Sequence, residues 1–226
     1  MTRFFVGITG ASGHVYAERL LRELLAAGHD VDVCLTGAGA KVLRHERGVP
    51  CEPGAALEPE ALAGWLGPGA PERVRSFAPE SIEAPPSSGT ALSGGAILCP
   101  CSMGTLARVA VGFSSNLVER AADVALKEGR PLLVVPRESP LSEVHLENLL
   151  RLARLGAAIV PAAPGFYHRP RTIDDLVGHV VGKVLDRLGV EHRGAVRWQG
   201  TEEPEPEPGT GAPPPRDPLA PGAGSA

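Results

Sequence analysis

Residues 4–28 read FFVGITGASGHVYAERLLRELLAAG, and this stretch decides the fold. Its first five residues form a short apolar run of the kind that a strand buried on both faces needs. Small residues follow at positions 10–13, and leucines then recur at helical spacing up to Gly28. A buried strand, a tight turn and an amphipathic helix form the repeating unit of a parallel α/β sheet.

The same alternation continues along the chain. We predict further strands at 31–35, 96–99, 132–135 and 157–160, and further helices at 40–47, 116–127, 143–155 and 172–188, with another helix starting after residue 102. Thr172 and Asp175 form a capping-box pattern at the start of the last helix. The fold class is therefore α/β: a three-layer, Rossmann- or flavodoxin-like fold with a parallel sheet and helices on both faces. Residues 68–95 lack periodicity, and we expect a long loop with a functional role there.

Composition excludes several classes of protein. The chain has 226 residues, a formal charge of −4 and no basic excess, which argues against nucleic-acid binding as its main role. No apolar run reaches the length of a membrane span, and the N-terminus does not resemble a signal peptide. Four scattered cysteines do not form a disulfide framework. We expect a cytoplasmic protein with neither a membrane nor a nucleic-acid partner.

The last 27 residues differ from the rest. They contain eight prolines, five acidic residues and one leucine, and they carry the chain's whole net charge. A segment so poor in apolar side chains cannot offset the entropy of ordering its backbone. We therefore expect a folded domain at 1–199 and a disordered acidic tail at 200–226; the tail is a solvated extension or, less favoured, an interaction segment.

Three turns carry hydroxyl groups at predicted strand ends. These are Gly10-Ala11-Ser12-Gly13, the turn that begins at Thr36, and Pro100-Cys101-Ser102-Met103-Gly104-Thr105. The carboxyl ends of parallel strands meet at one edge, where ligands bind in such sheets, and helix N-termini there favour anions. Each turn alone could be a simple helix cap with Ser12 as an N-cap. Together they favour a phosphorylated cofactor.

Two other patterns leave alternatives open. Cys99 and Cys101 could suggest a metal, but no second pair or nearby histidine completes a ligand set, so buried thiols are the better interpretation and no metal site is predicted. Arg137 and Glu138 follow a buried strand, either as functional groups or as a surface ion pair.

The assembled motifs resemble the UbiX-type flavin prenyltransferases of the flavodoxin-like flavoprotein-decarboxylase superfamily. The resemblance spans residues 1 to about 198. It rests on TGASG at 9–13, CPCSMGT at 99–105, NLVERAADV at 116–124, LKE at 126–128, VPRESP at 135–140, HLEN at 145–148 and PGFYH at 164–168. No single motif is specific to this family, but the presence of all of them in this order is.

The resemblance implies a metal-independent reaction. The dimethylallyl group of dimethylallyl phosphate is joined to N5 and C6 of reduced FMN, and the product, prenylated FMN, is the cofactor of UbiD-type decarboxylases. It also implies a homododecamer with flavin sites between subunits and delivery of the product to a UbiD-type partner. Whether the donor is the monophosphate or the diphosphate stays open.

The resemblance also implies roles for particular residues. Those for FMN binding are Gly10, Ala11, Ser12, Thr36, Ser102, Met103, Gly104, Thr105 and Arg137. Those for dimethylallyl phosphate are Lys127, Tyr167, Lys183, Ser88 and Gly89. Trp198 is the aromatic candidate that would help the reduced flavin to stabilise the carbocation-like prenyl fragment. The implied catalytic set is Ser12, Glu46, Lys127, Glu138 and Tyr167, in which Glu138 is the candidate proton acceptor and Ser12 and Glu46 tune N5.

The sequence departs from the family pattern at Gly37, where many members have lysine, and at Lys183, which is often arginine. Three other functions share parts of this pattern. A flavin-dependent cysteine decarboxylase would use a histidine near His14, and a flavin carrier would need neither Lys127 nor Glu138. A nicotinamide oxidoreductase is disfavoured because the G-x-G-x-x-G spacing is absent.

Overall fold

The computed structural model describes residues 2–192. Its strands are β1 (Arg3–Ile8), β2 (Asp30–Leu35), β3 (Val74–Phe77), β4 (Ala96–Cys101), β5 (Leu132–Pro136) and β6 (Ala158–Ile159). Its helices are α1 (His14–Ala26), α2 (Gly37–Arg47), α3 (Pro59–Leu66), α4 (Ala70–Arg73), α5 (Met103–Ala110), α6 (Leu117–Lys127), α7 (Glu143–Arg154) and α8 (Ile173–Leu188), with a 3₁₀ turn η1 (Pro85–Ser87). Trp198, the predicted boundary at 199 and the predicted tail lie outside the described residues.

The strands form one sheet in the order β3-β2-β1-β4-β5-β6, and every neighbouring pair is parallel. The predicted fold class is therefore confirmed. The chain builds the sheet outward from β1 in one direction and then from β4 in the other. The carboxyl ends of β1 and β4 thus flank the point where the strand order reverses, which is where doubly wound sheets bind ligands.

The prediction of one long loop over 68–95 was wrong in part. The edge strand β3 lies within it and pairs with β2, so the sheet has six strands rather than the five expected. The strand has four residues, of which only Val74 is buried, and so short a segment carries no readable alternation. Helix α3 was also not predicted.

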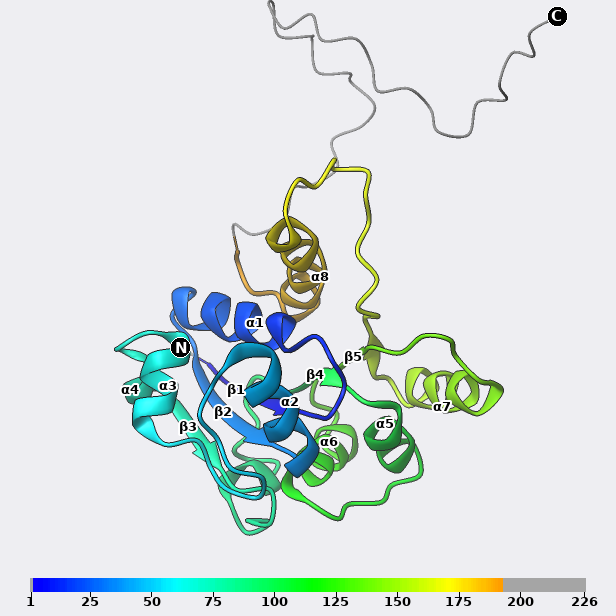
Figure 1. Ribbon diagram of the computed structural model, residues 1–226. Coiled ribbons are helices and arrows are strands. Elements are labelled where there is room, and N and C mark those ends of the chain that lie inside the picture. The colour runs from blue at the N-terminus through cyan, green and yellow to red at the C-terminus, as the bar shows by residue number, and fades with distance from the viewer. Residues whose placement is uncertain (1, 193–226) are drawn as a thin grey trace, which may run out of the picture. The chain divides into compact units, whose positions relative to one another are not determined.

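Helices cover both faces of the sheet (Figure 1). On one face α1, α2, α3 and α8 pack over a core that includes Val6, Leu20 and Val181. On the other, α5, α6 and α7 pack over a core that includes Leu98, Leu106 and Val118. The central strands β1, β2, β4 and β5 are buried on both sides, which explains why they read as apolar runs rather than as alternating patterns.

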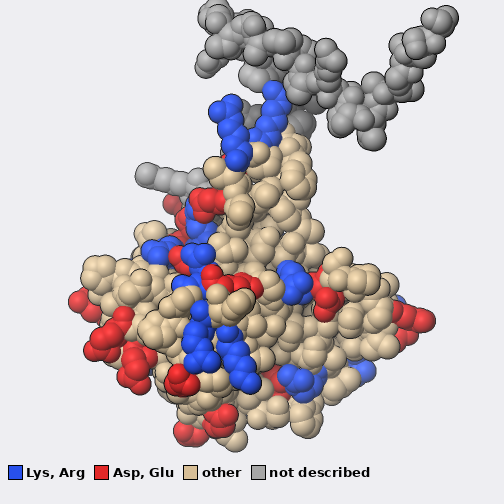
Figure 2. All heavy atoms as spheres, in the orientation of Figure 1, with Lys and Arg blue, Asp and Glu red and all other residues tan. Residues whose placement is uncertain are grey.

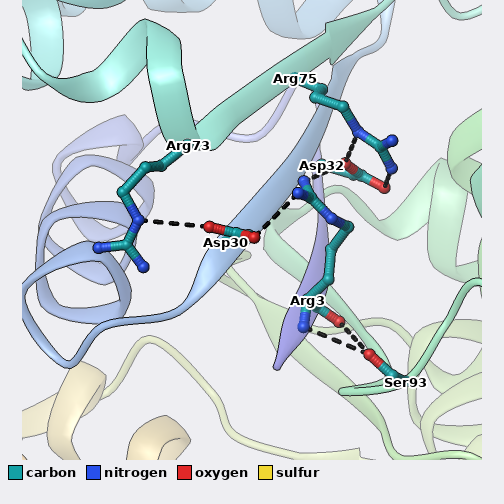
Figure 3. Close-up of polar contacts among 6 residues, drawn as sticks. All are labelled: Arg3, Asp30, Asp32, Arg73, Arg75 and Ser93. Atoms are coloured by element: carbon teal, nitrogen blue, oxygen red, sulfur yellow. Dashed lines mark hydrogen bonds and ion pairs between the residues drawn. The ribbon is translucent and has the colours of Figure 1, made fainter. Parts of the chain in front are cut away.

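Ion pairs link the amino ends of the first three strands (Figure 3). Asp32 on β2 is 3% exposed at its side chain and accepts hydrogen bonds from Arg3 Nη1 (3.0 Å) and from Arg75 Nε and Nη2 (2.8 and 2.7 Å). Asp30 accepts from Arg3 and from Arg73. The cluster lies at the sheet edge opposite the predicted ligand edge, so its role is to hold β1, β2 and β3 together.

We expect Asp32→Ala to lower the free energy of unfolding by about 2 kcal/mol, because two guanidinium groups lose their buried acceptor. Chemical denaturation measures this directly. The matched control is Asp123→Ala, which breaks an ion pair with Arg120 that is a third or more exposed and should cost about 0.5 kcal/mol or less. Equal losses in the two variants would contradict the structural role of Asp32.

Acidic and basic side chains lie next to one another on the face in Figure 2. This face therefore shows no continuous basic surface of the kind that nucleic-acid binding uses. Within residues 2–192, no helix is both long enough and apolar enough to cross a membrane.

Candidate functional site

The turns after β1 and β4 are joined by Thr9. Its Oγ1 donates to the carbonyl oxygen of Pro100 (2.9 Å) and accepts from the backbone N–H of Ser102 (2.7 Å). Thr9 is fully buried, so these bonds are shielded from water. The two turns at the reversal point of the sheet are therefore held in fixed register, as a shared ligand site requires.

The β1–α1 turn is built around Glu46. The carboxylate of Glu46 accepts from the backbone N–H of Gly13 (3.0 Å) and of His14 (2.9 Å), and from the hydroxyl of Ser12. Partial burial alone would raise the pKa of Glu46, but these hydrogen bonds outweigh it and lower the pKa. Ser12 is not a helix cap: Gly13 occupies the cap position at φ 104°, and Ser12 is exposed beside Glu46. The structure thus brings together the predicted pair Ser12 and Glu46.

The turn after β2 caps α2. Thr36 Oγ1 accepts from the backbone N–H of Gly39 at 3.0 Å. A Cβ on Gly39 would lie 2.4 Å from the carbonyl oxygen of Ile8, and one on Gly10 would lie 2.7 Å from Cβ of Ala38. The first two turns therefore touch, and only glycine fits at the contact. This places Thr36 beside Gly10 at one edge, as predicted.

The turn after β4 starts α5. Ser102 is the N-cap and accepts from the N–H of Thr105 (3.4 Å), while its hydroxyl donates to Thr105 Oγ1 (3.2 Å). Gly104 is exposed, whereas the side chains of Ala11 and Met103 are 4% and 6% exposed. Ala11 and Met103 can therefore offer a ligand mainly backbone groups. With α1 and α2, three helix N-termini point to this edge.

Sequence reasoning missed an ion pair behind α5. Glu119 on α6 is fully buried and pairs with Arg108 Nε, and its other oxygen accepts from the N–H and hydroxyl of Ser115 (2.8 and 2.7 Å). Arg108 Nη2 lies 3.4 Å from Thr105 Oγ1. Burial would raise the pKa of Glu119, but Ser115 and Arg108 lower it. The three-residue spacing of Thr105 and Arg108 across one helical turn was the available signal.

Arg137 follows β5 and lies over the first turn. Its Nε donates to the carbonyl oxygen of Ser12 at 3.1 Å. Glu138 is exposed, and its carboxylate accepts from the N–H of Ser139 at 3.0 Å. Arg137 and Glu138 do not form the surface ion pair considered from the sequence; within the described chain, Arg137 bonds to the first turn instead.

These residues form the carboxyl-edge group: Gly10, Ala11, Ser12, Thr36, Glu46, Ser102, Met103, Gly104, Thr105, Arg137 and Glu138. The group offers hydroxyls, helix N-termini and a guanidinium to an anion, and a carboxylate–hydroxyl pair beside them. Its contact glycines leave no room for side chains between the turns. This donor set fits the phosphate and ring of a flavin mononucleotide.

The cysteines of the chain are thiols outside the carboxyl-edge group. All four cysteines are free, and burial raises the pKa of Cys101 to about 12, so it stays a protonated thiol. Among residues 2–192, no three His, Cys, Asp or Glu side chains are placed to hold a metal ion.

Lys127, Ser88 and Gly89 form a separate, amino-edge group. Lys127 ends α6, and residues 128–131 lead directly into the start of β5. A Cβ on Gly89 would lie 2.4 Å from Cγ of Glu128, so the 88–89 segment rests beside Lys127. The group therefore lies at the amino ends of the strands, separated from the carboxyl edge by the length of a strand, roughly 16–20 Å. Within one chain the structure does not bring the two groups together.

Tyr167 and Lys183 form a third group beyond β6. Lys183 on α8 lines a groove of about 740 Å³ with Val160 and Ala163. Tyr167 lies in the turn before α8, half exposed, and its hydroxyl contacts His179 at 3.1 Å. Sequence reasoning missed His179, although its spacing of one helical turn from Lys183 puts both on one face of α8.

Comparisons with known proteins agree with a flavin site at the carboxyl edge. A family model described as Flavoprotein matches residues 1–185. Flavin prenyltransferase UbiX of Alkalihalophilus pseudofirmus is 48% identical over 193 residues, which cover 85% of this chain and 94% of that protein.

Two solved structures are similar over nearly their whole length. A dodecameric FMN-dependent UbiX-like decarboxylase from Escherichia coli O157:H7 has a TM-score of 0.76 at 40% identity, covering 88% of this chain and 100% of that one. AnUbiX in complex with FMN and dimethylallyl pyrophosphate has a TM-score of 0.77 at 34% identity, and the match covers 89% of this chain and 99% of that one.

Proposed function

The chain belongs to the UbiX family of flavin prenyltransferases, and we propose that it joins the dimethylallyl group of dimethylallyl phosphate to N5 and C6 of reduced FMN. The observation that carries this proposal is the carboxyl-edge group, in which three helix N-termini and their hydroxyls meet beside Arg137 and the Ser12–Glu46 pair. Reduced FMN supplies the electron-rich acceptor atoms. The relative solved with FMN and dimethylallyl pyrophosphate supports this pairing of substrates.

The acceptor end uses the protein's hydrogen-bonding groups. The helix N-termini at Thr36 and Ser102 favour the FMN phosphate, and Arg137 adds a charge that is already fixed by its bond to the first turn. Glu46 is ionised at neutral pH because its pKa is lowered, so it holds the hydroxyl of Ser12 as a donor to itself. That arrangement leaves the oxygen of Ser12 to accept a hydrogen bond from the flavin N5 position.

The donor end stabilises a leaving phosphate. As the allylic C–O bond breaks, its electron pair leaves with the phosphate, and the prenyl carbon bonds to N5. Lys127, Lys183 and the hydroxyl of Tyr167 would stabilise the departing anion. N5 loses its proton as it is alkylated. Closure then adds a proton to the prenyl double bond and removes one from C6, and exposed Glu138 at the carboxyl edge is the proposed acceptor of the C6 proton.

A complete site needs a second copy of the chain. Lys127, Ser88 and Gly89 lie at the edge of the sheet opposite Ser12 and Arg137, so a neighbouring chain has to supply one of the two groups. Helix α7 also leaves Val144, Leu146 and Leu150 at least half exposed, which is typical of a surface covered by a partner. We therefore propose a homo-oligomer, a dodecamer like the E. coli relative, with the site between subunits.

Prenylated FMN made here would pass to a UbiD-type decarboxylase. The protein makes the cofactor, and the partner enzyme uses it. Four free cysteines suit a reducing compartment, so we place the reaction in the cytoplasm.

The test is anaerobic incubation of the protein with FMN, dithionite and dimethylallyl phosphate, followed by mass spectrometry of the extracted flavin. A gain of one five-carbon prenyl unit supports the proposal, and a parallel reaction with dimethylallyl diphosphate identifies the donor. Unmodified FMN bound tightly would favour a flavin carrier instead.

The cysteine decarboxylase alternative is weaker. His14 is fully buried, and its Nε2 lies 3.1 Å from the carbonyl oxygen of Thr9 beneath the first turn. A histidine in that position does not face a substrate, so it cannot act as the catalytic base that this alternative needs.

A further inference from the structure

His179 connects the backbone of Gly165 to the hydroxyl of Tyr167. The N–H of Gly165 lies 3.3 Å from Nδ1 of His179, and Tyr167 Oη lies 3.1 Å from Nε2. The three groups come from two segments, the turn after β6 and the second turn of α8. The imidazole is therefore the link that ties the turn to the helix.

The contact with Gly165 determines the protonation state of the ring. A backbone N–H can only donate, so Nδ1 must present its lone pair and carry no proton. The neutral ring then has its proton on Nε2, and Nε2–H donates to Tyr167 Oη. A phenol oxygen that accepts this bond keeps its own hydrogen, and the bond from His179 restricts the directions in which that hydrogen can donate.

Packing holds the three groups in place. A Cβ on Gly165 would lie 3.0 Å from Cε1 of Tyr167 and 3.4 Å from Cε1 of His179, so both rings rest against the bare glycine. His168 stacks on His179 with ring centroids 5.1 Å apart and planes 7° from parallel. The ring of Tyr167 meets His179 edge-on at 5.5 Å. The orientation of the imidazole is thus set on several sides.

The surroundings oppose a charged imidazole. Burial lowers the pKa of His179, and the nearby His168 and Lys183 lower it further. His179 and Lys183 line the same groove of about 740 Å³. The groove is also lined by Asp186 and Arg187. At neutral pH it therefore presents the cations Lys183 and Arg187 beside one carboxylate, and the neutral His179 links it to the hydroxyl of Tyr167.

We infer that His179 is a positioning residue for the prenyl donor: by donating to Tyr167, it directs the hydrogen of the phenol toward the phosphate that Lys183 attracts. This inference rests on the proposed function, in which Tyr167 and Lys183 hold the phosphate. His179 itself does not touch the substrate. Its loss should weaken donor binding and leave FMN binding unchanged.

Two amide variants separate the two bonds of the ring. His179→Asn keeps an acceptor near Nδ1 for Gly165 but cannot reach Tyr167, whereas His179→Gln can place a donor near Nε2. In FMN-loaded protein, isothermal titration with dimethylallyl phosphate should show about tenfold weaker binding for His179→Asn, and about twofold or less for His179→Gln. The KM for the donor should rise in parallel, with the affinity for FMN unchanged.

Tyr167→Phe tests the same bond from the other side. If His179 acts through Tyr167, the double variant Tyr167→Phe/His179→Asn should bind the donor no more weakly than Tyr167→Phe alone. The inference would be overturned if His179→Asn and His179→Gln lost the same affinity for dimethylallyl phosphate. It would also be overturned if the losses of the two single variants added up in the double variant. The titration needs no turnover: binding without transfer would defeat the proposed function but still decide the role of His179, and no binding by the wild-type protein would overturn both.

Discussion

Lys127→Ala is expected to lower the rate of prenyl transfer by about 10²–10³-fold, because the departing phosphate loses a fixed positive charge. FMN affinity should stay within about twofold, since the proposed site for the cofactor phosphate consists of helix N-termini and Arg137 at the carboxyl edge. Lys127 lies next to Glu128, which contacts Gly89 at the same edge, and its ammonium group is held by an ion pair with Glu128. Initial rates of prenylated FMN formation and a flavin fluorescence titration measure the two effects separately.

Lys41→Ala is the matched control. Lys41 is exposed on α2 and lies in none of the three groups of site residues. Lys41→Ala should change neither the rate of prenylated FMN formation nor the affinity for FMN. A Lys127→Ala protein that keeps its full rate, or one that loses FMN together with its rate, would contradict the assignment of Lys127 to the phosphate.

Arg108→Met is expected to lower the free energy of unfolding at pH 7 by about 3 kcal/mol, because the fully buried carboxylate of Glu119 loses its charge partner. Methionine keeps much of the volume of the arginine stem, so the loss reports on charge rather than on packing. Urea denaturation at pH 7 gives the value.

The loss should shrink in acid. The pKa of Glu119 is lowered in the folded wild-type protein, so its contribution is present above its ordinary value near pH 4.5 and disappears as the pH falls through the lowered value. Below that range the carboxyl is neutral in wild type and variant alike, and their stabilities converge. Arg120→Met, which removes an exposed pair with Asp123, should show a small loss without this pH dependence. If Arg108→Met lowers the free energy of unfolding as much in acid, below the pKa of Glu119, as it does at pH 7, the loss comes from packing alone.

The sequence predicted the centre of the fold because its signals there are local. The run 4–8 and the leucines up to Gly28 specify β1 and α1 without reference to other segments. The shared edge of the three hydroxyl turns was also predictable, since parallel strands end on one side. The strand β3 was not, because four residues on a sheet edge gain their structure from pairing with β2 rather than from their own pattern.

The separation of the carboxyl-edge group from the amino-edge group could partly be predicted from the sequence. A helix between two parallel strands returns to the amino edge, so Lys127 at the end of α6 had to lie away from Ser12. The contacts of His179 were not accessible in the same way. Its neutral state depends on the N–H of Gly165, fourteen residues away, and no spacing rule specifies which backbone group meets a ring nitrogen.

The central claim is that prenyl transfer takes place between two chains, one supplying the carboxyl-edge group and the other Lys127. Differently tagged Lys127→Ala and Glu138→Ala chains can be co-expressed and their mixed oligomers isolated by tandem affinity. Assayed alone, each variant should form almost no prenylated FMN. The mixed oligomer should regain about one quarter of the wild-type rate, because about one site in four joins two intact edges. A mixed oligomer no more active than its parents would contradict the claim, since a site contained in one chain always keeps one of the two defects.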